Sequence, residues 1–429
     1  MGWARGLYST ALFALSPLIW RRIRREHALT ASRRMLRELR LGRIPRTPPG
    51  EPMLWLHCAS VGEVLAARPL IEALLERYPE HRLTLTTMTA TGAERARALA
   101  ASRGDERLVH RFIPLDFPAA AARFVSRLRP GLALFFETEL WPNLLHACRR
   151  QGVPVAVVNG RLSPRAFRGY RRLRPLMGEA LACVDWLAAK SSDDAQRFRE
   201  LGMAEARMTV VGSLKFDIAI DDKALEVSER LRTRLGERPV WVAGSTHEGE
   251  EAALLVAHAR LRERCPDAML VLVPRHPQRF DAVAALCAQA GMPAVRRSLD
   301  EWPTPDTAVY LGDTMGELLA LYGAGDLAFV GGSLVPIGGH NLLEPAALGV
   351  PVLTGPELAN FEEVAETLRE ADALVEAADE AVLAASLAAL FADPAERRRL
   401  GEAGRAVVAA NRGALERTLE GLARLLPPK

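Results

Sequence analysis

Glu63 occupies a position where a carboxylate could act as a general base. It closes the segment HCASVGE at 57–63, which follows an apolar run and precedes an amphipathic stretch. A carboxylate in the first turn of a helix is favoured in its charged form by the helix dipole. A base must be ionised before it can take a proton from a hydroxyl. We therefore predict Glu63 as a general base, although a glutamate that only caps backbone amides would give the same local pattern.

A second pair of carboxylates follows the apolar run at 132–136. Glu137 and Glu139 would point the same way if the strand continued through them. One or both are therefore predicted to line a ligand cleft. Helix capping ahead of Trp141 and Pro142 is the competing interpretation.

An arginine-rich segment, NGRLSPRAFRGYRRLR at 159–174, contains Arg161 and Arg165, with Phe167 and Tyr170 among its arginines. Such a cluster suits an acidic or phosphorylated acceptor, or lipid headgroups. RNA is a weaker interpretation because no nucleic-acid motif accompanies the cluster. Arginine greatly outnumbers lysine, which occurs only at 190, 215, 223 and 429. A plain solvated face is therefore equally compatible with the pattern.

Two segments of the second half contain residue types that bind phosphate. GSTHEGEE at 244–251 offers Ser245 and Thr246 as donors at the start of a helix. VPRHPQRF at 273–280 places Arg275 and His276 after a strand, and arginine binds phosphate or carboxylate through paired hydrogen bonds. A surface turn is the alternative for the second segment.

The glycine-rich segment at 333–356 is the strongest indication of a nucleotide site. Four candidates are consecutive: Gly338, Gly339, His340 and Asn341. The helical pattern LLEPAALG follows, and the free N–H groups at its start would attract a phosphate brought close by the glycines. Glu344, one turn in, would accept hydrogen bonds from ribose hydroxyls. A glycine-rich turn without a ligand is the alternative.

Several kinds of chemistry are not supported. The five cysteines include no C-x-x-C, which indicates a reducing compartment without disulfides or a cysteine metal site. No Asp-x-Asp follows an apolar strand, so a metal-bound diphosphate donor is not expected. No G-x-S-x-G occurs, so hydrolase triads are set aside. We therefore expect no metal and no cofactor.

Apolar runs that alternate with helical patterns must position these residues. They lie at 53–58, 82–87, 111–116, 132–136, 153–158 and 186–190 in the first half, and at 241–245, 269–274, 308–312, 327–332 and 350–353 in the second. This alternation predicts an α/β protein with a parallel, doubly wound sheet in each half. Ligands of such sheets bind beyond the carboxyl ends of the strands, where every candidate above lies.

The chain has 429 residues, of which 49% are hydrophobic and 25% charged, enough for two or three domains. We predict a helix with a basic flank (1–42), a Pro-rich linker (43–52), a Rossmann-like domain (53–211), a linker (212–238) and a second Rossmann-like domain with closing C-terminal helices (239–429). Two such halves would enclose a ligand cleft.

The N-terminal segment predicts a membrane anchor. Residues 7–20 are mostly apolar and RRIRRE follows at once. The run is shorter than the roughly 20 residues of a comfortable span, and a secretory signal would have its charges before the apolar core. We predict an interfacial helix with Trp3, Tyr8 and Trp20 at headgroup level. A helix docked on the protein itself and a single span with a cytoplasmic body are the alternatives.

Seven motifs occur in order along the chain: ASVGE, FFETELWPN, NGRLSPRAFRGYRRL, GSLKFD, AGSTHEGEE, VPRHPQRF and GGSLVPIGGHNLLEPAALGVPVLTGP. Together they resemble the signatures of bacterial 3-deoxy-D-manno-octulosonic acid (Kdo) transferases of lipopolysaccharide biosynthesis. The resemblance extends from the N-terminal segment to beyond residue 356. One departure is Ser213, where the family motif has asparagine, and Lys215 of the same motif is unaffected.

The resemblance implies a GT-B fold, with two Rossmann-like domains around a central cleft, and an inverting, metal-independent transfer of Kdo from CMP-Kdo to a lipid A precursor, lipid IVA. It implies Glu63 as the general base and Glu139 as a second carboxylate on the acceptor side, with Arg161 and Arg165. The residues that would hold CMP-Kdo are Lys215, Ser245, Thr246, Arg275, His276, Gly338, Gly339, His340, Asn341 and Glu344. The enzyme would work at the cytoplasmic face of the inner membrane, without a cofactor, nucleic acid or protein partner.

Two other classes of function stay open. One is another GT-B enzyme, such as a heptosyltransferase or a sugar-nucleotide epimerase, which would prefer a nucleotide other than CMP. The other is a non-catalytic, membrane-bound sugar-nucleotide module. Carboxylates at both Glu63 and Glu139 argue against it, because binding alone does not need an ionised base.

Overall fold

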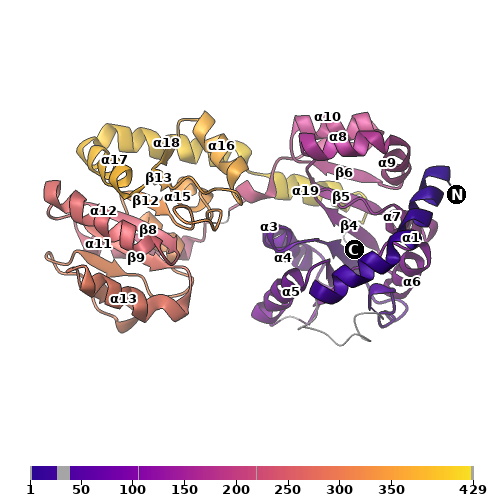
Figure 1. Ribbon diagram of the computed structural model, residues 1–429, viewed down its shortest axis with the longest axis horizontal. Coiled ribbons are helices and arrows are strands. Elements are labelled where there is room, and N and C mark those ends of the chain that lie inside the picture. The colour runs from indigo at the N-terminus through magenta and orange to yellow at the C-terminus, as the bar shows by residue number, and fades with distance from the viewer. Residues whose placement is uncertain (1, 27–38, 105, 219, 427–429) are drawn as a thin grey trace. The chain divides into compact units, whose positions relative to one another are not determined.

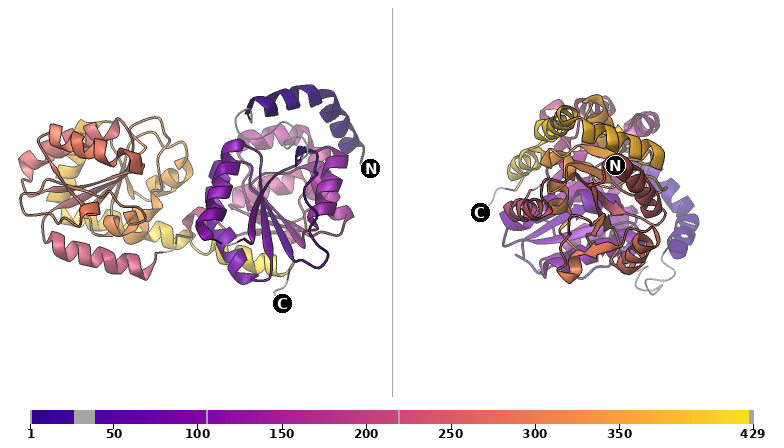
Figure 2. Two further views of the ribbon diagram at one scale, coloured as in Figure 1. Left: turned by 90° about the horizontal axis from the view of Figure 1, so that it is seen from below. Right: turned by 90° about the vertical axis from the view of Figure 1, so that its left-hand side faces the viewer.

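The computed structural model describes residues 2–26, 39–104, 106–218 and 220–426 and divides the chain into two units. The first unit is Met1–Asp217 together with Arg412–Lys429, and the second is Ile218–Asn411. Each unit is a parallel sheet with helices packed over both faces (Figures 1 and 2). The predicted α/β class with two doubly wound sheets is therefore confirmed.

The first sheet has the strand order β3-β2-β1-β4-β5-β6-β7. Its strands are β1 (Met53–His57), β2 (Arg82–Thr87), β3 (Leu108–Phe112), β4 (Leu132–Phe136), β5 (Val155–Gly160), β6 (Trp186–Ala189) and β7 (Met208–Val210). The central strands are continuous apolar runs because helices cover both of their faces. The order of the strands reverses between β1 and β4, which pair from Leu54 with Leu132 to His57 with Phe135.

The helices of the first unit connect these strands. They are α1 (Trp3–Glu26), α3 (Val61–Ala66), α4 (Arg68–Arg77), α5 (Ala90–Arg103), α6 (Pro118–Leu128), α7 (Pro142–Arg150), α8 (Pro164–Arg172), α9 (Arg174–Leu181), α10 (Ser192–Leu201) and α19 (Ala414–Ala423). Trp55 on β1 packs against the rings of Phe124 and Phe135, each with a centroid distance of 5.1 Å. Leu54 and Leu56 face the opposite layer, so β1 is buried on both sides.

Helix α19 returns to the first unit from the end of the chain. The hydroxyl of Tyr78 donates to the carbonyl of Leu426 at 2.7 Å. Gly421 lies so close to Trp186 that a Cβ there would meet the indole at 2.2 Å. The prediction that the C-terminal helices close the second domain is therefore wrong for α19, because its contacts are with the first sheet.

Helix α1 lies along the outside of the first unit (Figure 2). On its inner face, Ser9 exchanges hydrogen bonds with Asn143 on α7 at 3.1 and 3.3 Å. Tyr8 and Trp20 are partly buried against the protein, whereas the side chain of Trp3 is 71% exposed. Tyr8 and Trp20 therefore contact the unit itself, as the alternative of a docked helix expects, and the placement of the three aromatic side chains at headgroup level stays a prediction.

The outer face of α1 is apolar. Its large exposed side chains are Trp3, Leu7, Phe13, Leu15 and Leu18. Across the described residues, no helix combines the length and the apolar character that crossing a bilayer requires. Much of the predicted basic flank, residues 27–38, lies outside the described residues.

The second sheet has the strand order β10-β11-β9-β8-β12-β13-β14. Its strands are β8 (Val240–Thr246), β9 (Met269–Pro274), β10 (Ala294–Arg296), β11 (Val309–Leu311), β12 (Leu327–Val330), β13 (Val352–Thr354) and β14 (Leu374–Glu376). The order reverses between β8 and β12, so both units share the doubly wound plan.

The helices of the second unit are α11 (Asp222–Leu235), α12 (Glu250–Arg264), α13 (Phe280–Gln289), α14 (Leu318–Gly323), α15 (Leu343–Leu348), α16 (Glu362–Glu370), α17 (Glu380–Ala392) and α18 (Pro394–Asn411). Trp241, Phe329 and Leu387 belong to the core between the sheet and the helices on one of its faces.

The two predicted linkers are mostly structured. In the segment 43–52, the carbonyl of Ile44 accepts from Arg127 at 2.9 Å and the N–H of Thr47 donates to the Arg127 carbonyl. The segment 212–238 is divided between the units, because Leu214 and Phe216 are buried in the first and α11 packs on α14 in the second. Helix α11 of this segment is amphipathic. The charged residues on its exposed face led to the prediction of a linker, although its other face is packed.

Candidate active site

The predicted residues of the first unit gather where its sheet reverses order. Glu63 follows β1 and Glu139 follows β4, and these two strands are neighbours. Parallel strands present their carboxyl ends at one edge, and a doubly wound sheet binds ligands where the order reverses. The topology therefore brings the two predicted carboxylates to the edge at which a ligand is expected.

Glu63 is held by a reciprocal set of hydrogen bonds at the start of α3. Ser60 caps the helix by accepting from the N–H of Glu63 at 3.4 Å. Glu63 Oε2 accepts from the N–H of Ala59 at 2.8 Å, and Oε1 accepts from the hydroxyl of Ser60 at 2.9 Å. These three hydrogen bonds fix the position of the carboxylate.

The charge state of Glu63 differs from the expectation. Burial raises its pKa to about 7, and the negative charges of Glu139 and Glu137 raise it as well. The hydrogen bonds from Ala59 and Ser60 lower the pKa, but by less. The effect of burial on the pKa of Glu63 therefore exceeds that of the helix dipole. With a pKa of about 7, Glu63 can gain or lose a proton near neutral pH, as a general base requires.

The chain turns sharply between β4 and Glu139. Strand β4 ends at Phe136, and Glu137 has a left-handed φ of 57°, so the strand does not continue through the two carboxylates as predicted. Glu139 Oε2 accepts from Trp141 Nε1 at 2.8 Å and lies 3.5 Å from Nε2 of His57. Burial raises the pKa of Glu139, but His57 and Trp141 together hold it below its usual value.

The arginine-rich segment forms the end of β5 and α8. Arg161 and Arg165 are exposed, and Ser163 caps α8 by accepting from the N–H of Ala166 at 3.2 Å. Tyr170 on the same helix is partly buried, and the charge of Glu139 contributes to its raised pKa. Because the charge of Glu139 acts on Tyr170, α8 lies near the carboxylate site, and Arg165, Arg168, Arg171 and Arg172 on this helix are exposed.

In the second unit, the loops after β8 and β12 approach each other closely. A Cβ at Gly331 would meet the carbonyl oxygen of Ser245 at 2.8 Å, so only glycine fits there. Ser245 itself has a φ of 57°. Thr246 is fully buried and its hydroxyl donates to Glu251 at 3.0 Å, so its hydrogen is already used inside the fold.

Glu250 joins these two loops and was not anticipated. This fully buried carboxylate accepts from four backbone N–H groups, those of His247, Gly332, Ser333 and Leu334, at 2.7–2.9 Å. The two consecutive acids that open α12 in GSTHEGEE were the available signal. Glu250 therefore fixes the backbone of the two loops that carry residues predicted to bind the nucleotide.

Three imidazoles and one guanidinium lie together beside these loops. Nε2 of His247 is 2.8 Å from Nε2 of His340, with the rings stacked, and the ring of His276 meets His247 edge-on at 5.2 Å. Burial lowers the pKa of His340 to about 4, helped by the charges of His247, Arg275 and His276. Arg275 and His276 are exposed. The structure thus brings together the candidates from three separate segments.

The glycine-rich segment provides the remaining candidates. Gly338 and Gly339 have φ values of 98° and 75°, which side chains rarely adopt. Asn341 donates to Glu344 Oε1 at 3.1 Å, and burial raises the pKa of Glu344. The expected helix is α15, whose six residues are fewer than two turns, so backbone N–H groups rather than a long helix dipole would face a ligand.

Lys215 is the predicted donor residue that the fold separates from the others. It lies in the 3-10 turn Leu214–Phe216, which belongs to the first unit, whereas the remaining candidates for the donor belong to the second. Ser213 beside it is buried.

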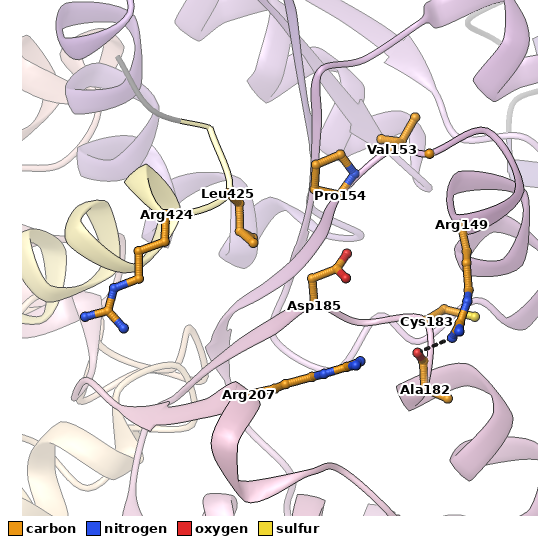
Figure 3. A pocket seen from close by; sticks show the side chains of 10 residues that line it. Arg149, Val153, Pro154, Ala182, Cys183, Asp185, Arg207, Arg424 and Leu425 are labelled. Atoms are coloured by element: carbon orange, nitrogen blue, oxygen red, sulfur yellow. Dashed lines mark hydrogen bonds between the residues drawn. The ribbon is translucent and has the colours of Figure 1, made fainter. Parts of the chain in front are cut away.

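The cavity in Figure 3 is a different place in the first unit. It measures about 400 Å³ and is lined by residues that precede strands, including Pro154 before β5, Asp185 before β6 and Arg207 before β7. It therefore lies at the amino ends of the strands, opposite the edge that carries Glu63. No group of three or more His, Cys, Asp or Glu side chains is arranged to hold a metal ion in the described ranges.

Comparison with known proteins gives consistent matches. Residues 36–218 match the family described as 3-deoxy-D-manno-octulosonic-acid transferase. The chain is 40% identical to the 3-deoxy-D-manno-octulosonic acid transferase of Haemophilus influenzae, with 86% of each chain covered. It is 42% identical to the protein of the same description from Bordetella pertussis, covering 97% of this chain and 98% of the relative.

Two solved structures resemble the fold. A glycosyltransferase from Rickettsia africae is 15% identical, with a TM-score of 0.53 over 89% of this chain and 100% of the other. The UDP-GlcNAc 2-epimerase from Neisseria meningitidis, bound to UDP-GlcNAc, is 14% identical, with a TM-score of 0.55 over 87% and 100%. At such identities the likeness concerns the fold alone, and it supports a GT-B-like pair of α/β domains.

Proposed function

Because this chain belongs to the Kdo transferase family, we propose that it transfers Kdo from CMP-Kdo to lipid IVA in lipopolysaccharide biosynthesis, with inversion at the anomeric carbon. The observation that carries the proposal is that Glu63 and Glu139 follow two neighbouring strands at the point where the first sheet reverses order, and that the charge of Glu139 acts on Glu63. A carboxylate whose pKa is about 7 is matched to the removal of a hydroxyl proton at neutral pH.

In the proposed reaction, Glu63 takes the proton of a sugar hydroxyl on the acceptor. The hydroxyl oxygen then bonds to the anomeric carbon of Kdo, while the bond from that carbon to the phosphate oxygen breaks and CMP leaves. The bonds from Ala59 and Ser60 hold the carboxylate in place before the proton arrives. Glu139 lies on the acceptor side, and Arg161 and Arg165 offer charge for the anionic acceptor.

The second unit holds the donor in this proposal. Arg275 and His276 are exposed beside the loops that Glu250 fixes, so they can meet the phosphate or the Kdo carboxylate. The other proposed donor residues are Ser245, Gly338, Gly339, His340, Asn341 and Glu344, with Lys215 from the first unit. Thr246 is fully buried and donates to Glu251, so its part is to hold the loop in place. Backbone N–H groups of the glycine-rich segment would supply neutral donors for the nucleotide.

A transfer assay tests the proposal. The full chain is incubated with freshly made CMP-Kdo and lipid IVA in the presence of EDTA. The molecular masses of the lipid products are then measured by mass spectrometry. A product heavier by one or more Kdo residues is expected, and Glu63→Gln should lose it while still binding CMP. The matched control is Glu72→Gln on α4, an exposed residue that pairs with Arg68. Near-normal transfer by Glu63→Gln would remove its assignment as the base.

The outer face of α1 supports a place on the cytoplasmic face of the inner membrane. Leu7 and Leu18 are 65% and 63% exposed, and exposed arginines end the helix. Flotation with vesicles that contain anionic phospholipid should capture the chain, and Leu7→Glu with Leu18→Glu should release it. Val256→Glu, an exposed position on α12, is the matched control. Equal capture of both variants would contradict the proposed location.

A further inference from the structure

Asn143 is a buried residue of the motif FFETELWPN, and the proposed reaction gives it no role. It lies in the first turn of α7, two residues after Trp141. Its Nδ2 donates to the carbonyl oxygen of Asp116 at 2.7 Å and to the hydroxyl oxygen of Ser9 at 3.1 Å. Its Oδ1 accepts from the guanidinium of Arg5 at 3.3 Å. A carbonyl oxygen can only accept, so the orientation of the amide is defined, and both of its polar atoms have partners inside the protein.

The carboxyl group of Asp116 holds the backbone of the same turn. Asp116 is buried in the loop between β3 and α6. Its Oδ2 accepts from the N–H of Asn143 at 3.1 Å, and its Oδ1 accepts from the N–H of Leu144 at 2.8 Å. These N–H groups belong to the first turn of α7 and have no carbonyl partner within the helix. Asp116 therefore fixes the start of α7 from a different part of the sheet.

Helix α1 completes this hydrogen-bond network from the outside of the unit. Helices α1 and α7 lie side by side (Figure 1). The side chains of Arg5 and Ser9 on α1 are buried, and the hydroxyl of Tyr8 forms a hydrogen bond with the side chain of Asp116. Buried polar groups are costly unless they have partners, so the inner face of α1 matches this one place on the unit.

The start of α7 also determines where Glu139 lies. Trp141 is the N-cap residue of α7, and its carbonyl oxygen accepts from the N–H of Leu145 at 2.9 Å. Its Nε1 donates to Glu139 Oε2 at 2.8 Å. Burial and then the charge of Glu139 raise the pKa of Glu63, so a movement of this turn would affect the proposed base. A displacement of about 1 Å at a site that positions reacting groups can lower the rate by a large factor.

We infer that Asn143 is a positioning residue for the transfer: together with the inner face of α1, it holds the turn 137–141 so that Glu139 stays beside the proposed base. Helix α1 then has a role at the site in addition to its proposed contact with the membrane. This inference rests on the proposed function, in which Glu139 belongs to the acceptor side. Asn143 acts through Trp141 and Glu139 and need not touch either substrate.

Transfer kinetics in detergent micelles test the inference, because capture by a membrane is then not needed. Asn143→Ala should lower kcat by at least about tenfold, and Ser9→Ala by about threefold. The KM for CMP-Kdo should change by less than about twofold, because Asn143 belongs to the first unit and nearly all proposed donor residues belong to the second. Ser9→Ala decides the test if Asn143→Ala does not fold.

Two matched substitutions separate positioning from stability. The hydroxyls of Ser9 and Thr10 each donate to the carbonyl of the residue four positions earlier, at 2.9 and 3.1 Å, but Thr10 is exposed. Thr10→Ala should therefore keep the wild-type kcat. Tyr78→Phe loses a hydrogen bond to Leu426 in the same unit, so it should lower the Tm and keep kcat. If Asn143→Ala and Ser9→Ala keep the wild-type kcat, or if Tyr78→Phe loses as much kcat as they do, the inference is overturned.

The indole N–H signal of Trp141 provides a readout that does not depend on transfer. In NMR spectra of the full chain with tryptophan labelled at its ring nitrogen, this signal is assigned by its loss in Trp141→Phe. Asn143→Ala should shift the signal, because the hydrogen bond to Glu139 changes, and Thr10→Ala should not. An unchanged signal in Asn143→Ala would overturn the inference. A wild-type chain without any transfer would instead remove the proposed function, and this signal would still test whether Asn143 holds the turn.

Discussion

Replacing Glu63 by glutamine should stabilise the protein at alkaline pH while abolishing transfer. In the folded chain the pKa of Glu63 is raised to about 7 from an ordinary value of 4.5. The folded state therefore holds this proton more tightly than the unfolded state does. Stability contributed by the proton is full below about pH 4.5 and is lost as the pH rises towards 7, because the unfolded chain ionises first. Glutamine cannot ionise, so it avoids this loss.

The magnitude follows from the size of the shift. Each pKa unit corresponds to about 1.4 kcal/mol, so an upper limit near 3 kcal/mol applies well above pH 7. Glu63 is only partly buried, and solvent screening reduces the figure to about 2 kcal/mol. Glutamine also loses one acceptor for Ala59 or Ser60, at a cost of about 1 kcal/mol at every pH. The difference between about pH 8 and pH 5 isolates the ionisation from this constant loss.

Thermal unfolding of the full chain at the two pH values measures this difference. A domain of roughly 150–250 residues shifts its Tm by about 2–4 °C for each kcal/mol, so Glu63→Gln should gain about 4–8 °C at pH 8 relative to pH 5. Glu72→Gln, which removes an exposed ion pair with Arg68, should show almost no dependence on pH. A Tm change for Glu63→Gln that is equal at the two pH values would refute the argument that burial opposes its ionisation.

Three further substitutions test contacts within each unit. Glu250→Ala should lower stability by about 3 kcal/mol and weaken CMP binding, because four backbone N–H groups lose their acceptor; unfolding and calorimetric titration check this. Gly355→Ala should destabilise by about 2 kcal/mol or more, since its Cβ would lie 2.3 Å from a backbone oxygen, whereas Gly169→Ala has open space and should be nearly neutral in denaturant unfolding. Asp217→Ala should cost about 1–2 kcal/mol in urea unfolding, because two N–H groups at the start of α19 donate to this carboxylate at 2.6 Å.

Much of the fold was predictable because buried parallel strands leave a strong pattern in the sequence. The runs at 82–87, 132–136 and 269–274 coincide with β2, β4 and β9. The edge strands β7, β10 and β14 were missed, since they are three residues long and only partly buried. The return of α19 to the first sheet was also missed, because local periodicity does not reveal which sheet an amphipathic helix covers.

The candidate site was predictable in its residues more than in its electrostatics. The candidate residues of both units lie on loops at the carboxyl ends of strands, so Glu63 and Arg275 could be predicted as candidates from their positions alone. The raised pKa of Glu63 was not, because it depends on burial and on Glu139, which is distant in sequence. His57 and Glu250 were missed as well, since each looks ordinary until its partners on another strand or loop are known.

The return of α19 makes the second unit an insertion within the first. Trp186 and Tyr78, in the unit that carries Glu63, are covered in part by Gly421 and Leu426, which are made after the whole second unit. During synthesis, part of the apolar core of the first unit therefore stays open until 412–426 have been made. Removal of residues 412–426 would therefore destabilise the first unit, which carries the proposed base. In the sequence, however, this segment directly follows the second unit.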